Sequence, residues 1–337
     1  MKTLLCAVLT AALLLTATAP HAQADDFIKW VDFDVPATLM RRLIDLDRQS
    51  FEDASRTRVD WIELLAYLGA KCGGSFRNFK EAHLKNLLAA LDGGQDMSEL
   101  GGKLKTFGYY YEVYSAVLGG LVGEYEVDNG AEGMEDWQPR YGLRAYSPIA
   151  KTFPFSHFDD FGTGRNYGYA RRHLGHDLMA ATGTPVIAAE SGVVEEIGWN
   201  RYGGWRLGIR SFDGLRYWYY AHMRQNRPYA QGLARGQVVM AGDVIGYVGR
   251  TGYSFKENTN GIKQSHLHWG LQIIFDPSQK DGSNQIWIDM YELTKLLESR
   301  KSETVRDPDT KEHTRAKGYR EAVPEGRFVP PPLQNPL

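Results

Sequence analysis

The sequence predicts an α+β protein in two parts, an N-terminal all-α region followed by a region rich in antiparallel β-sheet. Its 337 residues suit two domains better than one. Apolar residues recur at helical spacing as far as Tyr125, whereas short apolar or alternating runs dominate after Asp177. No helical pattern separates those runs, which favours an antiparallel sheet over alternating strand and helix units.

The N-terminus has the features of a secretory signal segment. Lys2 gives it a positive start, an apolar run covers residues 4–15, and the small-x-small sequence at 22–24 precedes Asp25. The apolar run is shorter than the roughly 20 residues that span a bilayer, so cleavage is favoured over an uncleaved anchor. We therefore predict a signal peptide over residues 1–24, export to the periplasm, cell wall or medium, and no stable membrane insertion after cleavage.

Residues 25–127 are predicted to form a helical domain of unknown role. Stretches 59–68 and 83–91 repeat apolar residues at intervals of three and four, and a tyrosine-rich helix follows them. Cys72 is the one cysteine left after signal cleavage, and its place at a helix end favours a buried filler over a nucleophile. Glu63 could be imagined as the acid of a second, muramidase-type site, but a capping or snorkelling glutamate is far commoner.

The remaining chain divides into three segments. Residues 128–172 replace the helical pattern with Gly, Asp, Pro and aromatic residues, which is typical of a long connection over a domain surface, and we expect it to border the functional site. The β-rich domain is predicted over 173–300, with a hairpin turn at Asp213–Gly214 and an amphipathic helix over 288–299. Residues 301–337 are charged and then proline-rich, which predicts a solvated tail.

The charge balance argues against nucleic acid as a partner. The chain has 39 lysines and arginines against 41 aspartates and glutamates, a formal net charge of −2. No excess of positive charge is left to follow a phosphate backbone.

Five of the nine histidines lie in the β-rich half in recognisable arrangements. His266 and His268 are two residues apart, so on a strand both imidazoles project from one face. His173 and Asp177 are four apart, which places them on one side of either a strand or a helical turn. Two histidines and one aspartate make three ligands, the number that leaves a position open for water at a catalytic zinc. His222 ends a strongly aromatic strand.

With His222 included, the segment from about Tyr146 to Phe275 resembles the lysostaphin/LytM-type zinc metallopeptidases of family M23, which cut bacterial cell-wall peptides. The order and spacing of its four motifs are those of the family. These motifs are His173-x-Gly175-x-Asp177, Tyr220-x-His222-Met223, the Gly249–Ser254 turn and His266-x-His268.

The resemblance implies a role for each matched position. His173, Asp177 and His268 would hold one zinc ion, and His266 and His222 would act beside it as catalytic residues without binding it. An imidazole suits a base because its unperturbed pKa of about 6.5 lies near neutral pH. The chain has no His-Glu-x-x-His motif that would supply a glutamate instead. The implied function is a zinc-dependent endopeptidase acting on stems or crosslinks of peptidoglycan.

The sequence departs from the family pattern in small ways and contains other candidate residues. Met223 stands where leucine is usual, and the loop over 255–264 is long, which puts substrate preference in doubt. His176 is expected to point away from Asp177, and His157 is expected to be a structural or solvated loop residue. Asn166 could cap the metal in a latent precursor, although a turn role is favoured.

Two other functions compete with peptidoglycan hydrolysis. One is a non-catalytic peptidoglycan-binding or amidase-activating protein, since some members of the family have lost their ligands. The complete set of ligands and auxiliary histidines in this chain favours the enzyme. The other is a metallopeptidase acting on glycine-rich proteins. The helical half could recognise the wall, hold a partner, or fold back over the groove.

Overall fold

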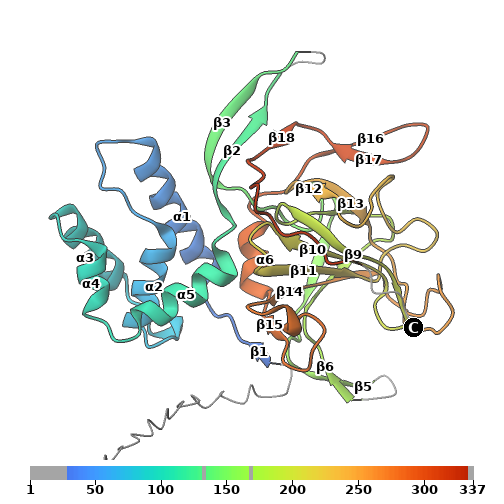
Figure 1. Ribbon diagram of the computed structural model, residues 1–337, viewed down its shortest axis with the longest axis horizontal. Coiled ribbons are helices and arrows are strands. Elements are labelled where there is room, and N and C mark those ends of the chain that lie inside the picture. The colour runs from blue at the N-terminus through green and yellow to red at the C-terminus, as the bar shows by residue number, and fades with distance from the viewer. Residues whose placement is uncertain (1–28, 131–133, 167–169, 333–337) are drawn as a thin grey trace, which may run out of the picture.

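The computed structural model describes residues 29–130, 134–166 and 170–332, and the predicted signal segment lies outside them. It confirms the predicted fold class, because a group of helices lies beside a unit rich in antiparallel sheet (Figure 1). Within the described residues, no helix has the length and apolar character needed to cross a bilayer.

The N-terminal helices pack around a core of leucines and aromatic residues. Asp60 caps the second helix by accepting hydrogen bonds from the main chain of Ile62 and Glu63. Glu63 therefore lies in the first turn, where a negative charge suits the helix dipole. Cys72 is buried at the end of this helix, and burial raises the pKa of its thiol. The helices are α1 Ala37–Glu52, α2 Trp61–Lys71, α3 Glu81–Asp92, α4 Met97–Gly102 and α5 Phe107–Leu118, with a 3-10 turn η1 at Phe76–Asn78.

One large sheet forms the β-rich unit. Its main path runs β1-β15-β14-β11-β10-β9-β12, while β7 pairs with β14 and β4. Trp218 and Trp269 stack face to face at its centre and are fully buried. All of its pairs are antiparallel except β1 with β15. The strands are β1 Lys29–Val31, β4 Phe155–Phe158, β7 His176–Ala180, β9 Gly192–Asn200, β10 Gly204–Ser211, β11 Arg216–Ala221, β12 Val238–Val239, β14 His266–Ile273 and β15 Ile286–Ile288.

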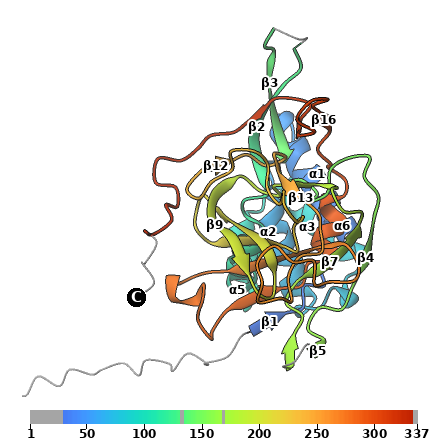
Figure 2. The same cartoon turned by 90° about the vertical axis from the view of Figure 1, so that its right-hand side faces the viewer.

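Smaller strand pairs surround this sheet, as the turned view in Figure 2 shows. The segment expected to be a long connection instead contains several short strands, and the expected solvated tail forms three more. The tail strand β18 pairs with β2, and Tyr319 on it is buried against Tyr125. These elements are β2 Val122–Asp128, β3 Trp137–Leu143, β5 Gly164–Asn166, β6 Ala170–Arg172, β8 Pro185–Ile187, β13 Val244–Tyr247, β16 Thr304–Arg306, β17 His313–Arg315 and β18 Tyr319–Arg320.

The expected helix over 288–299 is divided at Asp289. Strand β15 ends at Ile288, and helix α6 covers only Tyr291–Leu297. The main-chain amide of Asp289 donates to Val31, and its carboxylate accepts from the amide of Tyr291 at 3.0 Å. These two bonds turn the chain between strand and helix, a geometry that apolar periodicity does not reveal.

A buried arginine joins the helices to the sheet. Arg216 on β11 pairs with Glu190 at 2.9 Å and donates to the main-chain oxygen of Ala116 in the last turn of α5 at 3.0 Å. Trp218 donates to the same Glu190 carboxylate at 2.7 Å. A side chain at Gly120 would collide with Glu190 and Arg216. The helical half is therefore seated on the sheet through charged groups shielded from water.

Asp289 makes the stability of the fold depend on pH. Burial, together with Asp159, Asp32 and Glu292 nearby, raises the pKa of Asp289 to about 6. Because the native pKa exceeds the unfolded value of about 3.9, the carboxylate destabilises the fold above pH 6, and the penalty disappears as the pH falls towards 4. We expect Asp289→Asn to raise the free energy of unfolding at pH 7 by about 1–2 kcal/mol, allowing for partial exposure.

Urea unfolding at pH 7 and at pH 3.5 measures this effect. Asparagine also accepts the Tyr291 amide, so the turn is retained. The difference between wild type and variant should vanish at pH 3.5, where both states of the wild type are protonated at this position. An equal difference at both pH values would contradict the assignment to the Asp289 charge.

Candidate metal centre

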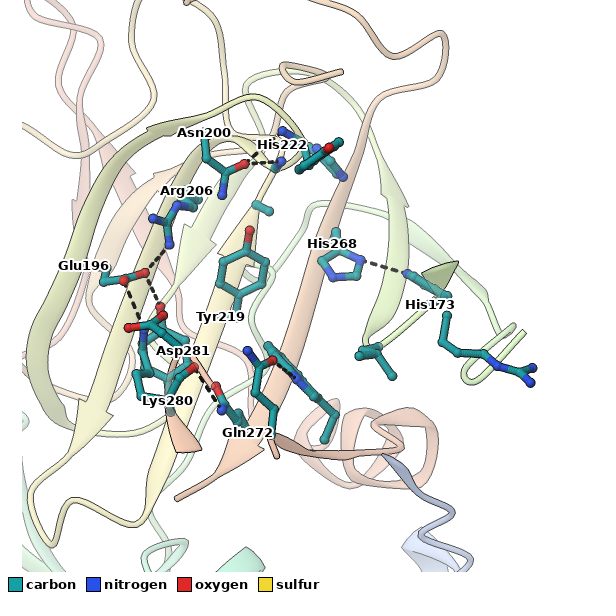
Figure 3. A pocket seen from close by; sticks show the side chains of 18 of the residues that line it. His173, Glu196, Asn200, Arg206, Tyr219, His222, His268, Gln272, Lys280 and Asp281 are labelled. Carbon is teal, nitrogen blue, oxygen red and sulfur yellow. Dashed lines mark hydrogen bonds and ion pairs between the residues drawn. The ribbon is translucent and has the colours of Figure 1, made fainter. Parts of the chain in front are cut away.

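Two neighbouring strands and two loops bring the five predicted site residues together. Asp177 on β7 lies directly opposite His268 on β14 in the sheet register. His266 lies two residues earlier on β14, so its side chain is on the same face. His173 precedes β7, and His222 follows β11, whose last residue lies opposite His268. Figure 3 shows His173, His222 and His268 around one end of a pocket.

Three donor atoms converge in this cluster. His173 Nε2 lies 2.8 Å from His268 Nδ1 and 3.1 Å from Asp177 Oδ1. His268 Nδ1 lies 2.9 Å from the same carboxylate oxygen. Two imidazole nitrogens and one carboxylate oxygen are the donor set of open zinc sites, and these atoms are close enough to share one ion. The residues present therefore fit a zinc ion.

The electrostatics of Asp177 and His268 favour the protonation states that bind metals, whereas at His173 burial would lower the pKa but hydrogen bonds with Asp160 and Asp177 raise it. Burial would raise the pKa of Asp177, but hydrogen bonds with His173 and His268 hold it well below its ordinary value. Burial lowers the pKa of His268 to about 4. Asp177 is therefore a carboxylate and His268 a neutral imidazole at physiological pH, which are the forms that bind metals.

Asp160 and Arg165 form an outer layer around the ligands, which the sequence analysis missed. Asp160 Oδ1 accepts from His173 Nδ1 at 2.6 Å, which leaves Nε2 of this histidine free to bind a cation. Arg165 donates to Asp160 and to Asp177 Oδ2, at 2.8 and 2.9 Å. Burial would raise the pKa of Asp160, but His173 and Arg165 bring it down to about 2. The sequence held one signal for Asp160 and Arg165, because both lie in the segment 128–172 that was expected to border the site.

Main-chain oxygens orient the two remaining histidines of the cluster. His222 Nδ1 lies 2.9 Å from the main-chain oxygen of Thr251, and His266 Nδ1 lies 2.9 Å from that of Gln264. A carbonyl oxygen only accepts, so each Nδ1 donates, and in the neutral imidazole the lone pair is on Nε2. His266 Nε2 lies 3.7 Å from Asp177 Oδ2. The ring centres of His222 and His266 are 4.9 Å apart. Thr251 belongs to the Gly249–Ser254 turn, so this turn orients His222.

His157 and His176 form a separate pair that does not join the cluster. His157 lies on β4 and not in a loop, and its Nδ1 is 2.8 Å from His176 Nε2. The other nitrogen of His157 is 2.8 Å from Glu298. Burial lowers the pKa of His176 to about 4. This pair connects β4 and β7 to Glu298 at the end of α6. The side chain of Asn166, another candidate, lies outside the described part of the chain.

Two hollows flank the cluster and differ in chemistry. One, of about 620 Å³, extends from His173, His222 and His268 over Tyr219 to a group of charged side chains (Figure 3). The other, of about 890 Å³, also reaches His222 and exposes more apolar surface, although Arg165, Arg201 and Lys263 line it as well. Its apolar side chains are Phe158, Met179, Tyr253, Phe255 and Ile262. Both are lined by Arg165, Tyr202 and His222, so they form one groove that passes the cluster.

Residues 171–282, which include all five clustered residues, match the model of peptidase family M23. The chain carries an M23 peptidase domain. It is 41% identical over 124 residues to the L-Ala–D-Glu endopeptidase of Bacillus subtilis, covering 37% of this chain and 36% of that protein. It is 39% identical over 83 residues to lysostaphin of Staphylococcus simulans, covering 24% of this chain and 16% of that protein. The chain thus spans about a third or less of the length of these relatives.

The likeness in structure extends beyond the M23 segment. A crystal structure from Ruminococcus gnavus, designated a glycyl-glycine endopeptidase LytM, aligns with a TM-score of 0.52 and 25% identity. The alignment covers 80% of this chain and 89% of that one, far more than residues 171–282 alone. The M23 domain of this chain is therefore homologous to peptidoglycan endopeptidases, and its helical surroundings also have a structural counterpart.

Proposed function

We propose that this chain is a zinc-dependent endopeptidase that hydrolyses peptide stems or crosslinks of bacterial peptidoglycan. The observation that carries the proposal is the convergence of three donor atoms, from His173, Asp177 and His268, beside two free imidazole nitrogens. The relatives with an M23 domain are named as endopeptidases, which supports the same reaction class. Export follows from this substrate, and the N-terminal segment supplies the expected signal.

Different residues of the site have different roles in the proposed hydrolysis. Zinc held by the three ligands supplies a Lewis acid that polarises the scissile carbonyl and lowers the pKa of water towards about 7. His266 accepts the proton of the attacking water at Nε2 and then delivers it to the leaving amine. We assign His222, which Thr251 holds in place, to stabilise the tetrahedral oxyanion. Burial lowers the pKa of His222 well below its ordinary value, so its Nε2 must take up a proton during the reaction before it can donate to the oxyanion.

Zinc content and the release of new amino groups from purified peptidoglycan test this function. Wild type should hold about one zinc per chain and release amino groups. His266→Ala should keep its zinc and lose about 10²–10⁴-fold in rate, the usual contribution of a general base. The control is His83→Ala, in the remote helix α3, which should match wild type.

Each other result has a definite meaning. Absence of zinc from the wild type would refute the metal site, and full activity of His266→Ala would refute its role as base. Stoichiometric zinc without cleavage of peptidoglycan would refute the enzyme and favour a peptidoglycan-binding or amidase-activating protein.

A further inference from the structure

The hollow of about 620 Å³ ends in a group of charged side chains at the far side from the cluster (Figure 3). Glu196 on β9 lies between two cations there. Arg206 on β10 forms an ion pair with it, and Lys280 Nζ lies 3.0 Å from its other oxygen. Tyr217 also donates to this carboxylate at 2.8 Å. We name Glu196, Arg206 and Lys280 the charged end of the groove.

Two cations face one partly buried carboxylate at the charged end. The Glu196 carboxylate already accepts hydrogen bonds from Arg206, Lys280 and Tyr217, so it only partly neutralises each cation. Asp281 also lies 3.3 Å from Lys280, but its side chain is 83% exposed, so water screens its charge. Arg206 Nε is buried without an acceptor among the residues that the structure describes. An arginine that lines a hollow and has one donor without an acceptor is suited to bind a carboxylate.

The cations are held in place before any ligand arrives. The 3-10 turn η2, Pro277–Gln279, is closed by a capping box from Asp276 and leads directly into Lys280. Gln272, buried on β14, donates to the main-chain oxygens of Gln279 and Lys280 at 2.8 and 3.2 Å. The Lys280 ammonium lies 4.3 Å from the ring centre of Tyr217. Little side-chain entropy remains to be lost on binding, which increases affinity.

We propose that the charged end binds a free carboxylate of the substrate, so that acidic stem peptides are preferred to uncharged bridges such as polyglycine. This inference rests on the proposed function, because it assigns the substrate of the same groove. The opposite hollow also carries cations, but Arg165 is paired with Asp160 and Asp177, and Arg201 lies over the rings of Tyr202 and Phe255. Lys263 is a third cation there, so the variants described below decide which hollow holds the carboxylate.

A matched pair of peptides tests the inference. Both contain an L-alanyl-D-glutamyl unit, and they differ only in whether the free carboxyl group of the glutamate is a carboxylate or a carboxamide. We expect wild type to give at least a tenfold higher kcat/KM for the carboxylate, with the ratio falling as salt is added. Pentaglycine should be a poorer substrate than either peptide.

Single variants then assign this preference to residues. Arg206→Gln and Lys280→Gln should each raise KM about tenfold for the carboxylate peptide alone, with kcat little changed. Arg206→Lys should restore part of the preference because the charge is kept. The control is Lys256→Gln, an exposed lysine outside both hollows, which should behave as wild type. Zinc content and melting temperature show whether each variant is folded.

Failure of this inference can be distinguished from failure of the proposed function. Binding of both peptides to zinc-loaded His266→Ala is measured by calorimetry, which needs no turnover. Tighter binding of the carboxylate peptide without cleavage by wild type would refute the enzyme and support the carboxylate site. Equal kcat/KM for both peptides, or equal losses on both in Arg206→Gln, would overturn the carboxylate site and leave the enzyme standing.

Discussion

Replacing His268 with alanine is expected to abolish both zinc binding and cleavage of peptidoglycan. Its Nδ1 lies within 2.9 Å of the donor atoms of both His173 and Asp177, so it is central to the cluster. Mutation of a residue that hydrogen-bonds to a metal ligand usually lowers metal affinity by about 10–100-fold. Loss of a ligand itself should therefore lower zinc affinity by more than about 100-fold. Two remaining ligands hold zinc too weakly to survive competition with a chelator.

Zinc affinity is measured by competition with a chromogenic chelator, and activity by release of amino groups. The circular dichroism of the variant should match that of wild type, because Trp218 and Trp269 in the adjacent core keep their packing. His313→Ala is the control, since this histidine lies on β17 outside both hollows. Retention of stoichiometric zinc by His268→Ala would show that other residues hold the metal.

Replacing Arg216 with methionine is expected to destabilise the whole fold. Its side chain is 2% exposed and contacts Glu190, Asp213 and the main chain of Ala116. Without it, Glu190 remains as a buried carboxylate with no cation, and loss of one partner of such a pair costs about 3–5 kcal/mol. Urea unfolding should therefore show a lower midpoint for helices and sheet together.

A surface pair provides the comparison for this effect. Arg320→Met breaks the ion pair with Glu126, whose side chain is 38% exposed, and should change the free energy of unfolding by less than about 1 kcal/mol. The double variant Glu190→Leu with Arg216→Met should recover part of the loss, because no unpaired charge remains. A loss of under 1 kcal/mol in Arg216→Met alone would show that Arg216 does not join the two halves.

The fold class could be predicted from the sequence because the two apolar periodicities occupy separate parts of the chain. The spacing of His266 and His268 was also informative, because alternate side chains of a strand point to the same face. The structure brings these residues close to His173, Asp177 and His222, and their roles remain predictions. The resemblance, and not spacing, selected His268 over His266 as a ligand.

The remaining features depend on contacts between distant segments. Arg165 on β5 contacts Asp177 on β7, a contact between two different sheets, and three-residue strands such as β5 have too few positions for a periodic pattern. Lys280 reaches Glu196 through pairing across the sheet and the η2 turn. The charged strands of the tail gave no apolar signal, since they pair by main-chain hydrogen bonds at sheet edges.

The bond from Arg216 to Ala116 has a consequence for how the sequence can change over time. Its acceptor is a main-chain oxygen in the last turn of α5, where helices leave carbonyl groups unpaired. The side chain at position 116 takes no part in this bond, although its size is limited because Ala116 is buried in the core. The exposed outer faces of the helices also take no part in it, so they can diversify and acquire new binding partners without disturbing the groove.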